Sequence, residues 1–221
     1  MLFYSKKMKK FLLLAFILLV NNGYSQEAFN YKKQFAAMQK ESKDLNSVFQ
    51  YSKQLKKYIS NDTLQTDNEM LHLLIGYTAQ PSYSSKKDVL AANPIFKLNE
   101  AGKFQLAKEQ ADKILQKNPF HIKVMIEMNY SLTNLGKLKE AKEIQYRMFK
   151  IYKAMLYSCG GKPQENSIFA LAPEDGQSFV KFLLRETIDK ISSGKDKDGN
   201  TVDMISIKKN GKTVVYRFLR N

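Results

Sequence analysis

Hydrophobic and polar residues follow two different periods along this chain. Between residues 29 and 158, apolar side chains recur every three or four positions, which is the spacing of one face of an α-helix. Beyond Cys159, Gly160 and Gly161 the spacing changes toward the alternation that is typical of β-strands. The pattern therefore predicts a mainly α protein with a small C-terminal α+β tail over residues 159–221.

A self-match at an offset of 34 residues divides the central helical segment into two similar units. The first unit is predicted to hold helices over residues 94–101 and 104–117, and the second over residues 122–135 and 138–156. Asn93 is expected to cap the first helix, and Pro94 to take its first position, where a missing N–H costs nothing. The matching positions are Leu98 and Leu132, Gly102 and Gly136, Lys103 and Lys137, and Ala107 and Ala141.

This period and these residue types are those of tetratricopeptide repeats. Glycine permits the tight turn between paired helices, and a small residue lets the helices approach closely. We therefore expect two tetratricopeptide-like units over residues 93–158. Because a free-standing array of such units needs about three of them, the helices in residues 26–92 are expected to act as an N-terminal cap.

The cap region is predicted to contain two helices between Phe29 and Ile59, followed by a short apolar helix that Asp67 caps and that ends near Tyr77. The segment Gly76–Ser85, with Pro81 and six hydroxyl side chains, is predicted to be an irregular loop. Such loops carry binding or catalytic residues in many proteins, or they merely join helices.

The tail is predicted to begin with a strand over residues 168–172 and a helix over 173–184, and Thr187–Ile191 either continues that helix or forms a strand. Asn210-Gly211 is the favoured pair for a two-residue type I′ hairpin turn, so Lys209 should pair with Lys212. We expect a small antiparallel sheet that packs either on the neighbouring helix or on the last helix of the second unit. One face of this hairpin would carry Ile205, Ile207, Val214, Tyr216 and Phe218.

Three stretches of the chain resemble a known family. They are IGYTAQPSY, NPIFKLNEAGKFQLAKEQADKILQKNPF and SLTNLGKLKEAKE, and a β-rich tail follows them. In this order they resemble domain of unknown function 4919, which occurs in envelope proteins of Gram-negative bacteria. The resemblance extends over nearly all of the chain after residue 25, and it implies this architecture without implying an activity.

Residues 1–25 are typical of a cleavable signal peptide. Four lysines precede an uninterrupted apolar run over residues 11–20, which is too short to span a bilayer, and small residues stand before a cleavage point at Gln26. We therefore expect a periplasmic or secreted protein without a transmembrane segment. The whole chain carries a net charge of +15, and removing the four lysines leaves 32 basic and 21 acidic residues, a net charge of +11.

The sequence offers few residues with the chemistry of a catalytic or metal site. A thiol nucleophile at Cys159 would need a base, and the only histidines, His72 and His121, are distant in sequence; we expect His72 in the core and His121 on the surface. Asp196–Asp203 alternates oxygen ligands but lacks the glycine and glutamate of a calcium loop, so a polar turn is expected. No catalytic residue, metal, cofactor or nucleic acid is predicted.

The predicted ligand site lies on the first helix of the second unit, where Lys123, Glu127, Tyr130 and Asn134 share one side. A cation, an anion, a ring and an amide suit an extended peptide. With the positive charge of the chain, this predicts a non-enzymatic interaction module that binds an acidic segment of an envelope protein. Two alternatives stay open: an envelope hydrolase that uses the Gly76–Ser85 loop and a carboxylate such as Glu69, and a protein that binds anionic glycan or lipid surfaces.

Overall fold

Residue chemistry explains where the helices begin and end in the computed structural model. The structure describes residues 28–84 and 90–220, so the predicted signal peptide lies outside the described residues. The N-terminal part contains α2 (Tyr31–Lys43), α3 (Tyr51–Ile59) and α4 (Asp67–Tyr77). Asp67 was wrongly expected to cap α4. Thr66 is the cap, and it forms a capping box with Glu69, because a threonine hydroxyl at this position can accept from the backbone N–H three residues on.

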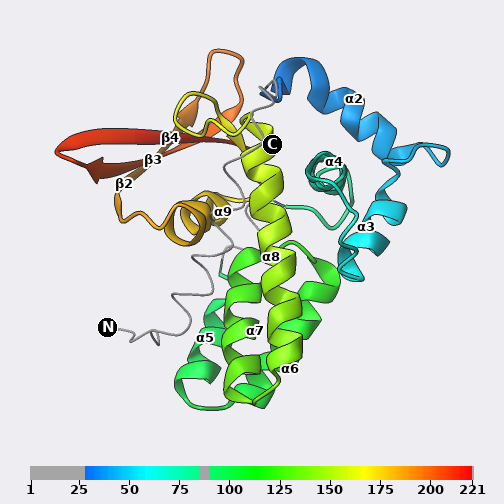
Figure 1. Cartoon of the computed structure of the whole chain (residues 1–221), viewed down its shortest axis with the longest axis vertical. Coiled ribbons are helices and arrows are strands. Elements are labelled where there is room, and N and C mark those ends of the chain that lie inside the picture. The colour runs from blue at the N-terminus through cyan, green and yellow to red at the C-terminus, as the bar shows by residue number, and fades with distance from the viewer. Residues whose placement is uncertain (1–27, 85–89, 221) are drawn as a thin grey trace.

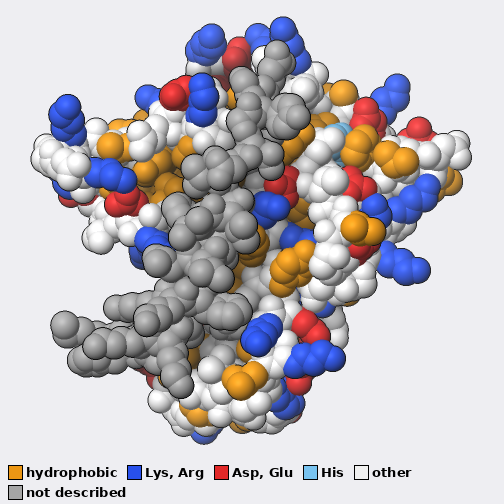
Figure 2. Space-filling model, viewed as in Figure 1, with side chains coloured by type: hydrophobic (Ala, Val, Ile, Leu, Met, Phe, Trp, Pro, Cys, Tyr) orange, Lys and Arg blue, Asp and Glu red, His pale blue; other side chains and the backbone are white. Residues whose placement is uncertain are grey.

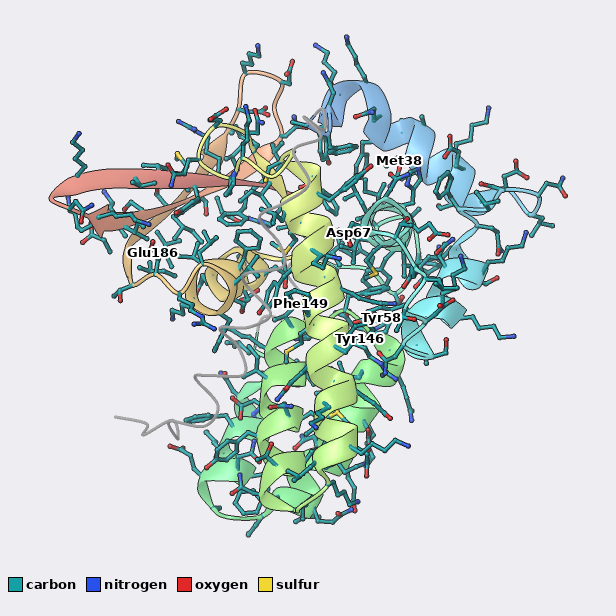
Figure 3. The ribbon with its side chains drawn as sticks, in the orientation of Figure 1. Met38, Tyr58, Asp67, Tyr146, Phe149 and Glu186 are labelled. Carbon is teal, nitrogen blue, oxygen red and sulfur yellow. The ribbon has the colours of Figure 1, made fainter. Side chains whose placement is uncertain are left out.

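Helix α4 is the buried centre of the N-terminal part. Every residue from Met70 to Tyr77 is buried, including Gly76, where an added Cβ would lie 2.7 Å from the Cβ of Ser42 in α2. Because Gly76 and Tyr77 are helical, the loop that was expected to begin at Gly76 begins at Thr78. Tyr58 of α3, labelled in Figure 3, is fully buried, and its hydroxyl lies 3.3 Å from the backbone oxygen of Pro119.

Two helical hairpins follow, with helices near the predicted positions. They are α5 (Asn93–Glu100) with α6 (Phe104–Lys117), and α7 (Ile122–Asn134) with α8 (Leu138–Ser158). Both turns have the same backbone form: Gly102 and Gly136 have φ angles of 70° and 71°, in the left-handed region that favours glycine. The Asn93 cap is wrong, because α5 already includes Asn93 and its cap residue is Ala92, which offers no side-chain hydrogen bond.

Helix α8 runs through the middle of the molecule and joins its parts. Figure 1 shows the N-terminal helices on one side of α8 and the sheet on the other. On the N-terminal side, the Arg147 guanidinium donates to the Ile59 carbonyl over 2.6 Å, and the buried Lys150 ammonium donates to Gln65 Oε1 over 3.1 Å. Burial lowers the pKa of Lys150. These bonds hold the turn between α3 and α4 against α8.

The tail forms a four-stranded mixed sheet in the order β1-β4-β3-β2. The expectation of an antiparallel sheet is wrong, because the two-residue β1 (Ile168–Phe169) pairs parallel to β4 (Lys212–Arg220). The hairpin of β3 (Thr201–Lys209) and β4 is confirmed, with Lys209 opposite Lys212. The predicted face of this hairpin points inward; Ile205, Ile207, Tyr216 and Phe218 are buried and Val214 packs against them.

The predicted helix over residues 173–184 divides into two elements, α9 (Pro173–Ser178) and a π-helical turn over Phe179–Leu183. The segment Thr187–Ile191 was expected either to continue this helix or to form a strand. It forms a strand, because all of it except Thr187 lies in β2 (Ile188–Lys195). Helix α9 packs on α7, β3 and β4, and one continuous cluster of buried apolar residues extends from Met38 to Phe218. Within residues 28–84 and 90–220, no helix is long and apolar enough to cross a membrane.

Candidate functional site

The predicted ligand face lies on α7, and all four of its side chains are at least partly exposed. Tyr130 is 44% exposed and Asn134 is exposed, while Lys123 and Glu127 are partly exposed. The ring of Tyr130 stands edge-on to Phe104 of α6 with 6.0 Å between the ring centroids, and the Asn134 amide donates to the Tyr130 carbonyl over 2.9 Å. Packing and hydrogen bonding therefore hold the ring and the amide in place at the surface.

Glu127 has a partner within the protein. The Asn99 amide of α5 donates to Glu127 Oε2 over 2.9 Å and to the Glu127 carbonyl over 3.1 Å, and the Ser131 hydroxyl donates to Asn99 Oδ1 over 2.7 Å. Partial burial raises the pKa of Glu127. This network joins α5 to α7. Glu127 therefore helps to hold the two helices together, besides belonging to the predicted ligand face.

Phe96 of α5 is a residue of this face that sequence reasoning missed. It is 48% exposed, and the 34-residue offset places it opposite Tyr130, so the repeat itself could have found it. Helix α5 packs against α7, which puts a half-exposed aromatic ring at the same position of two neighbouring helices. We name Phe96, Lys123, Tyr130 and Asn134 the α5–α7 face.

A second site, which we name the junction pocket, lies where three segments distant in sequence meet. Its cavity volume is about 30 Å³, far below the roughly 300–1,000 Å³ of pockets for drug-sized ligands. The segments are the loop after α4, the turn between α6 and α7, and the start of α9. The pocket is lined by Tyr77, Tyr83, Ser84, Asn118, Phe120, His121, Leu171, Ala172, Glu174 and Asp175.

His121 and Asp175 are both buried at the junction pocket. His121 was wrongly expected to be a surface residue; it is only 9% exposed because the start of α9 covers the α6–α7 turn. Asp175 Oδ2 accepts from the backbone N–H groups of Leu171 and Ala172 over 3.1 and 2.9 Å. Complete burial raises the pKa of Asp175 to about 7. The pocket thus gathers an imidazole and carboxyl groups, the types that acid–base chemistry uses.

The loop between Thr78 and Ser84 has a defined place at this pocket. The Tyr83 hydroxyl donates to the Leu171 carbonyl over 3.0 Å, which anchors the loop on the tail, and Tyr83 and Ser84 both line the pocket. Glu69, which the hydrolase alternative paired with this loop, is engaged elsewhere. It accepts from Lys57 over 2.6 Å and from the Thr66 N–H over 2.8 Å, and its pKa falls to about 2 since these bonds outweigh its burial.

The remaining candidates from the sequence have structural partners. Burial raises the pKa of Cys159 to about 11, and its thiol lies 3.1 Å from the Leu156 carbonyl of its own helix, so it is a poor nucleophile. His72 is a core histidine, as expected: its ring stacks on Phe49 and its Nδ1 lies 2.9 Å from the Asn68 carbonyl. Asp196 accepts from three donors of the turn that ends at Asn200, which confirms a polar turn there.

The comparisons with known proteins show the family of the chain. Residues 36–216 match the family described as a domain of unknown function, DUF4919, and the chain belongs to this family. No curated protein and no solved structure matches it. The function therefore has to be argued from the two sites themselves.

Proposed function

We propose that the chain is an exported, non-enzymatic protein–protein interaction module of the tetratricopeptide type, which binds an extended acidic peptide segment across the α5–α7 face. The observation that carries this proposal is the pair of half-exposed rings, Phe96 and Tyr130, at equivalent positions of two adjacent hairpins. Two half-exposed rings at the same position of neighbouring helices give this face an apolar character, which supports a binding surface.

The polar groups around these rings suit the backbone and side chains of a peptide. Asn134 holds its amide at the surface beside Tyr130, and Lys97 and Lys123 supply a cation on each of the two helices. An extended peptide needs amide partners for its backbone and rings on which its side chains can lie. The net charge of the chain, +15 in full and +11 after loss of the predicted signal peptide, favours carboxylate-bearing segments over basic ones.

The α5–α7 face can be tested with a peptide selected from a displayed random library and labelled for fluorescence anisotropy. Tyr130→Ala and Phe96→Ala should each weaken its binding by about 1–2 kcal/mol at every salt concentration, because a ring at the centre of an interface contributes chiefly by burial. Lys123→Glu should lower both the affinity and its dependence on salt, since salt raised from about 0.05 to 0.5 M shortens the Debye length from roughly 14 to 4 Å.

The matched control for the ring variants is Phe182→Ala, which removes a 51% exposed ring from the tail. It should leave the peptide affinity unchanged. Selected peptides without acidic residues, or equal affinities for the wild type and the Tyr130→Ala variant, would contradict the proposal.

A specific observation also supports a second function, binding to an anionic lipid surface. The turn between α2 and α3 lies at the end of the molecule opposite the sheet (Figure 1), and it exposes Leu45 by 75% and Val48 by 68%. Residues 31–59 contain seven lysines and two acidic residues, and Figure 2 shows lysine and hydrophobic side chains interspersed in this region. Exposed aliphatic side chains within a lysine-rich segment suit the interface of an anionic bilayer.

Cosedimentation with vesicles that contain about 30% phosphatidylglycerol tests this second function. The double variant Leu45→Asp/Val48→Asp should lose on the order of 2 kcal/mol of binding, because two aliphatic side chains no longer enter the bilayer interface. Leu138→Asp, a charge introduced at a 60% exposed leucine of α8, is the control and should bind like the wild type. Equal binding to neutral phosphatidylcholine vesicles would exclude an anionic surface as the ligand.

A further inference from the structure

Glu174 lines the junction pocket and has no side-chain partner among the described residues, so its carboxylate faces the pocket. Glu174 is only 5% exposed. Its carboxylate forms no hydrogen bond or ion pair with any of the described residues, and the side chain lines the pocket. Its neighbour Asp175 is a second buried carboxyl group at this pocket. The Glu174 oxygens are not among the fully buried polar atoms that lack a partner, so they meet solvent through the pocket. Buried polar groups in folded proteins almost always have a partner, and here that partner is solvent. A ligand in the pocket can take the place of this solvent.

The other walls of the pocket suit a positive charge. Tyr77, Tyr83 and Phe120 contribute aromatic rings; the centroids of Tyr77 and Phe120 are 4.9 Å apart, and those of Tyr77 and Tyr83 are 5.5 Å apart, both pairs meeting edge-on. Aromatic rings attract cations that come within about 6 Å of the ring centroid. A carboxylate together with several rings is therefore a cation-binding combination, whereas a neutral or anionic ligand would leave the Glu174 charge uncompensated.

The size of the pocket selects among cations. A cavity of about 30 Å³ accepts an –NH₃⁺ group, which is close to water in size. The same cavity is too small for a quaternary ammonium group with its methyl groups. An –NH₃⁺ group also has three donors for the carboxylate and for hydroxyl or carbonyl oxygens. No cluster of three metal-ligating side chains occurs among the residues that the structure describes, so a metal ion has too few ligands here.

We propose that the junction pocket binds a primary ammonium group, with Glu174 as its counter-ion and the rings of Tyr77, Tyr83 and Phe120 as its walls. This site is distinct from the α5–α7 face and does not depend on it. The ammonium group belongs either to a free small amine or to a lysine side chain of a protein partner. Tyr83 and Ser84, from the loop after α4, form part of the pocket.

Titration of the ¹⁵N-labelled protein with methylammonium chloride at constant ionic strength tests this proposal. We expect saturable shifts in the amide resonances of residues 118–121 and 171–176, and no such shifts with tetramethylammonium or sodium. Glu174→Gln should weaken methylammonium binding by roughly tenfold or more, because it removes the charge while keeping the shape. Glu186→Gln, at a partly exposed glutamate of the tail that pairs with Lys209, is the matched control and should bind like the wild type.

A second variant keeps the test decisive if Glu174→Gln fails to fold. Ala172→Leu fills the pocket without altering its charge and should likewise abolish the shifts. A parallel titration with a lysine-containing peptide distinguishes the sources: binding roughly tenfold tighter than methylammonium identifies a protein lysine, and equal or weaker binding identifies a free amine. Equal shifts with tetramethylammonium, or unchanged binding by Glu174→Gln and Ala172→Leu, would overturn the proposal, whatever the outcome for the α5–α7 face.

Discussion

Replacing Arg220 with methionine will destabilise the fold by about 3–5 kcal/mol, because it leaves the carboxylate of Asp203 buried without its counter-ion. Arg220 and Asp203 are 7% and 2% exposed, and the guanidinium donates to both carboxylate oxygens, with 3.1 Å from Nη2 to Oδ1. The pair joins the end of β4 to β3 in the middle of the sheet. Urea unfolding followed by circular dichroism will measure the loss.

Two controls separate the buried pair from ordinary surface charges. In Asp203→Leu/Arg220→Met both charges are gone, so most of the lost stability should return. Lys209→Met removes one partner of the exposed pair with Glu186, labelled in Figure 3, where the Nζ–Oε1 distance is 2.7 Å; it should cost no more than about 1 kcal/mol. A loss below about 1 kcal/mol for Arg220→Met would mean that Asp203 is solvated in solution.

Asp175 will make the protein less stable as the pH rises from about 4 to about 7. Burial raises the pKa of this carboxyl from 3.8 to about 7, and Glu174 adds to the rise, while the two backbone N–H groups and Arg220 oppose it. Between these two pH values the unfolded chain releases the proton and the folded chain keeps it, so ionisation favours unfolding. Above pH 7 both states are ionised and the effect of Asp175 is constant, on the order of 4 kcal/mol.

Asp175→Asn isolates this effect. The amide oxygen can still accept from the N–H groups of Leu171 and Ala172, but it carries no charge at any pH. The variant should match the wild type near pH 4 and exceed it by several kcal/mol near pH 8 in urea unfolding curves collected across this range. Parallel curves for the two proteins would show that Asp175 titrates near its ordinary pKa and is not buried in solution.

The features that could be predicted from the sequence depend on contacts between near neighbours in the chain. Helix periodicity placed α6 at its observed bounds and the ends of the other hairpin helices within two residues. Gly102, Gly136 and the Asn210-Gly211 pair marked the turns, because each adopts a positive φ that most residues avoid. The register of the β3–β4 hairpin followed from its two-residue turn. The exposed ring of Tyr130 followed from periodicity and the repeat.

The meeting of distant segments could not be predicted from the sequence. The parallel pairing of Ile168 with Phe218 turns a hairpin into a mixed sheet, and no local pattern in a two-residue strand specifies it. His121 looked like a surface residue because nothing nearby in the sequence covers it; α9, some fifty residues later, does. Glu174 and Asp175 line the same pocket as Tyr77 and Phe120 because packing between distant segments brings them together. Pockets depend on long-range packing. Hydrophobic periodicity predicts which face of a helix or strand is buried, but it does not predict which other element covers that face.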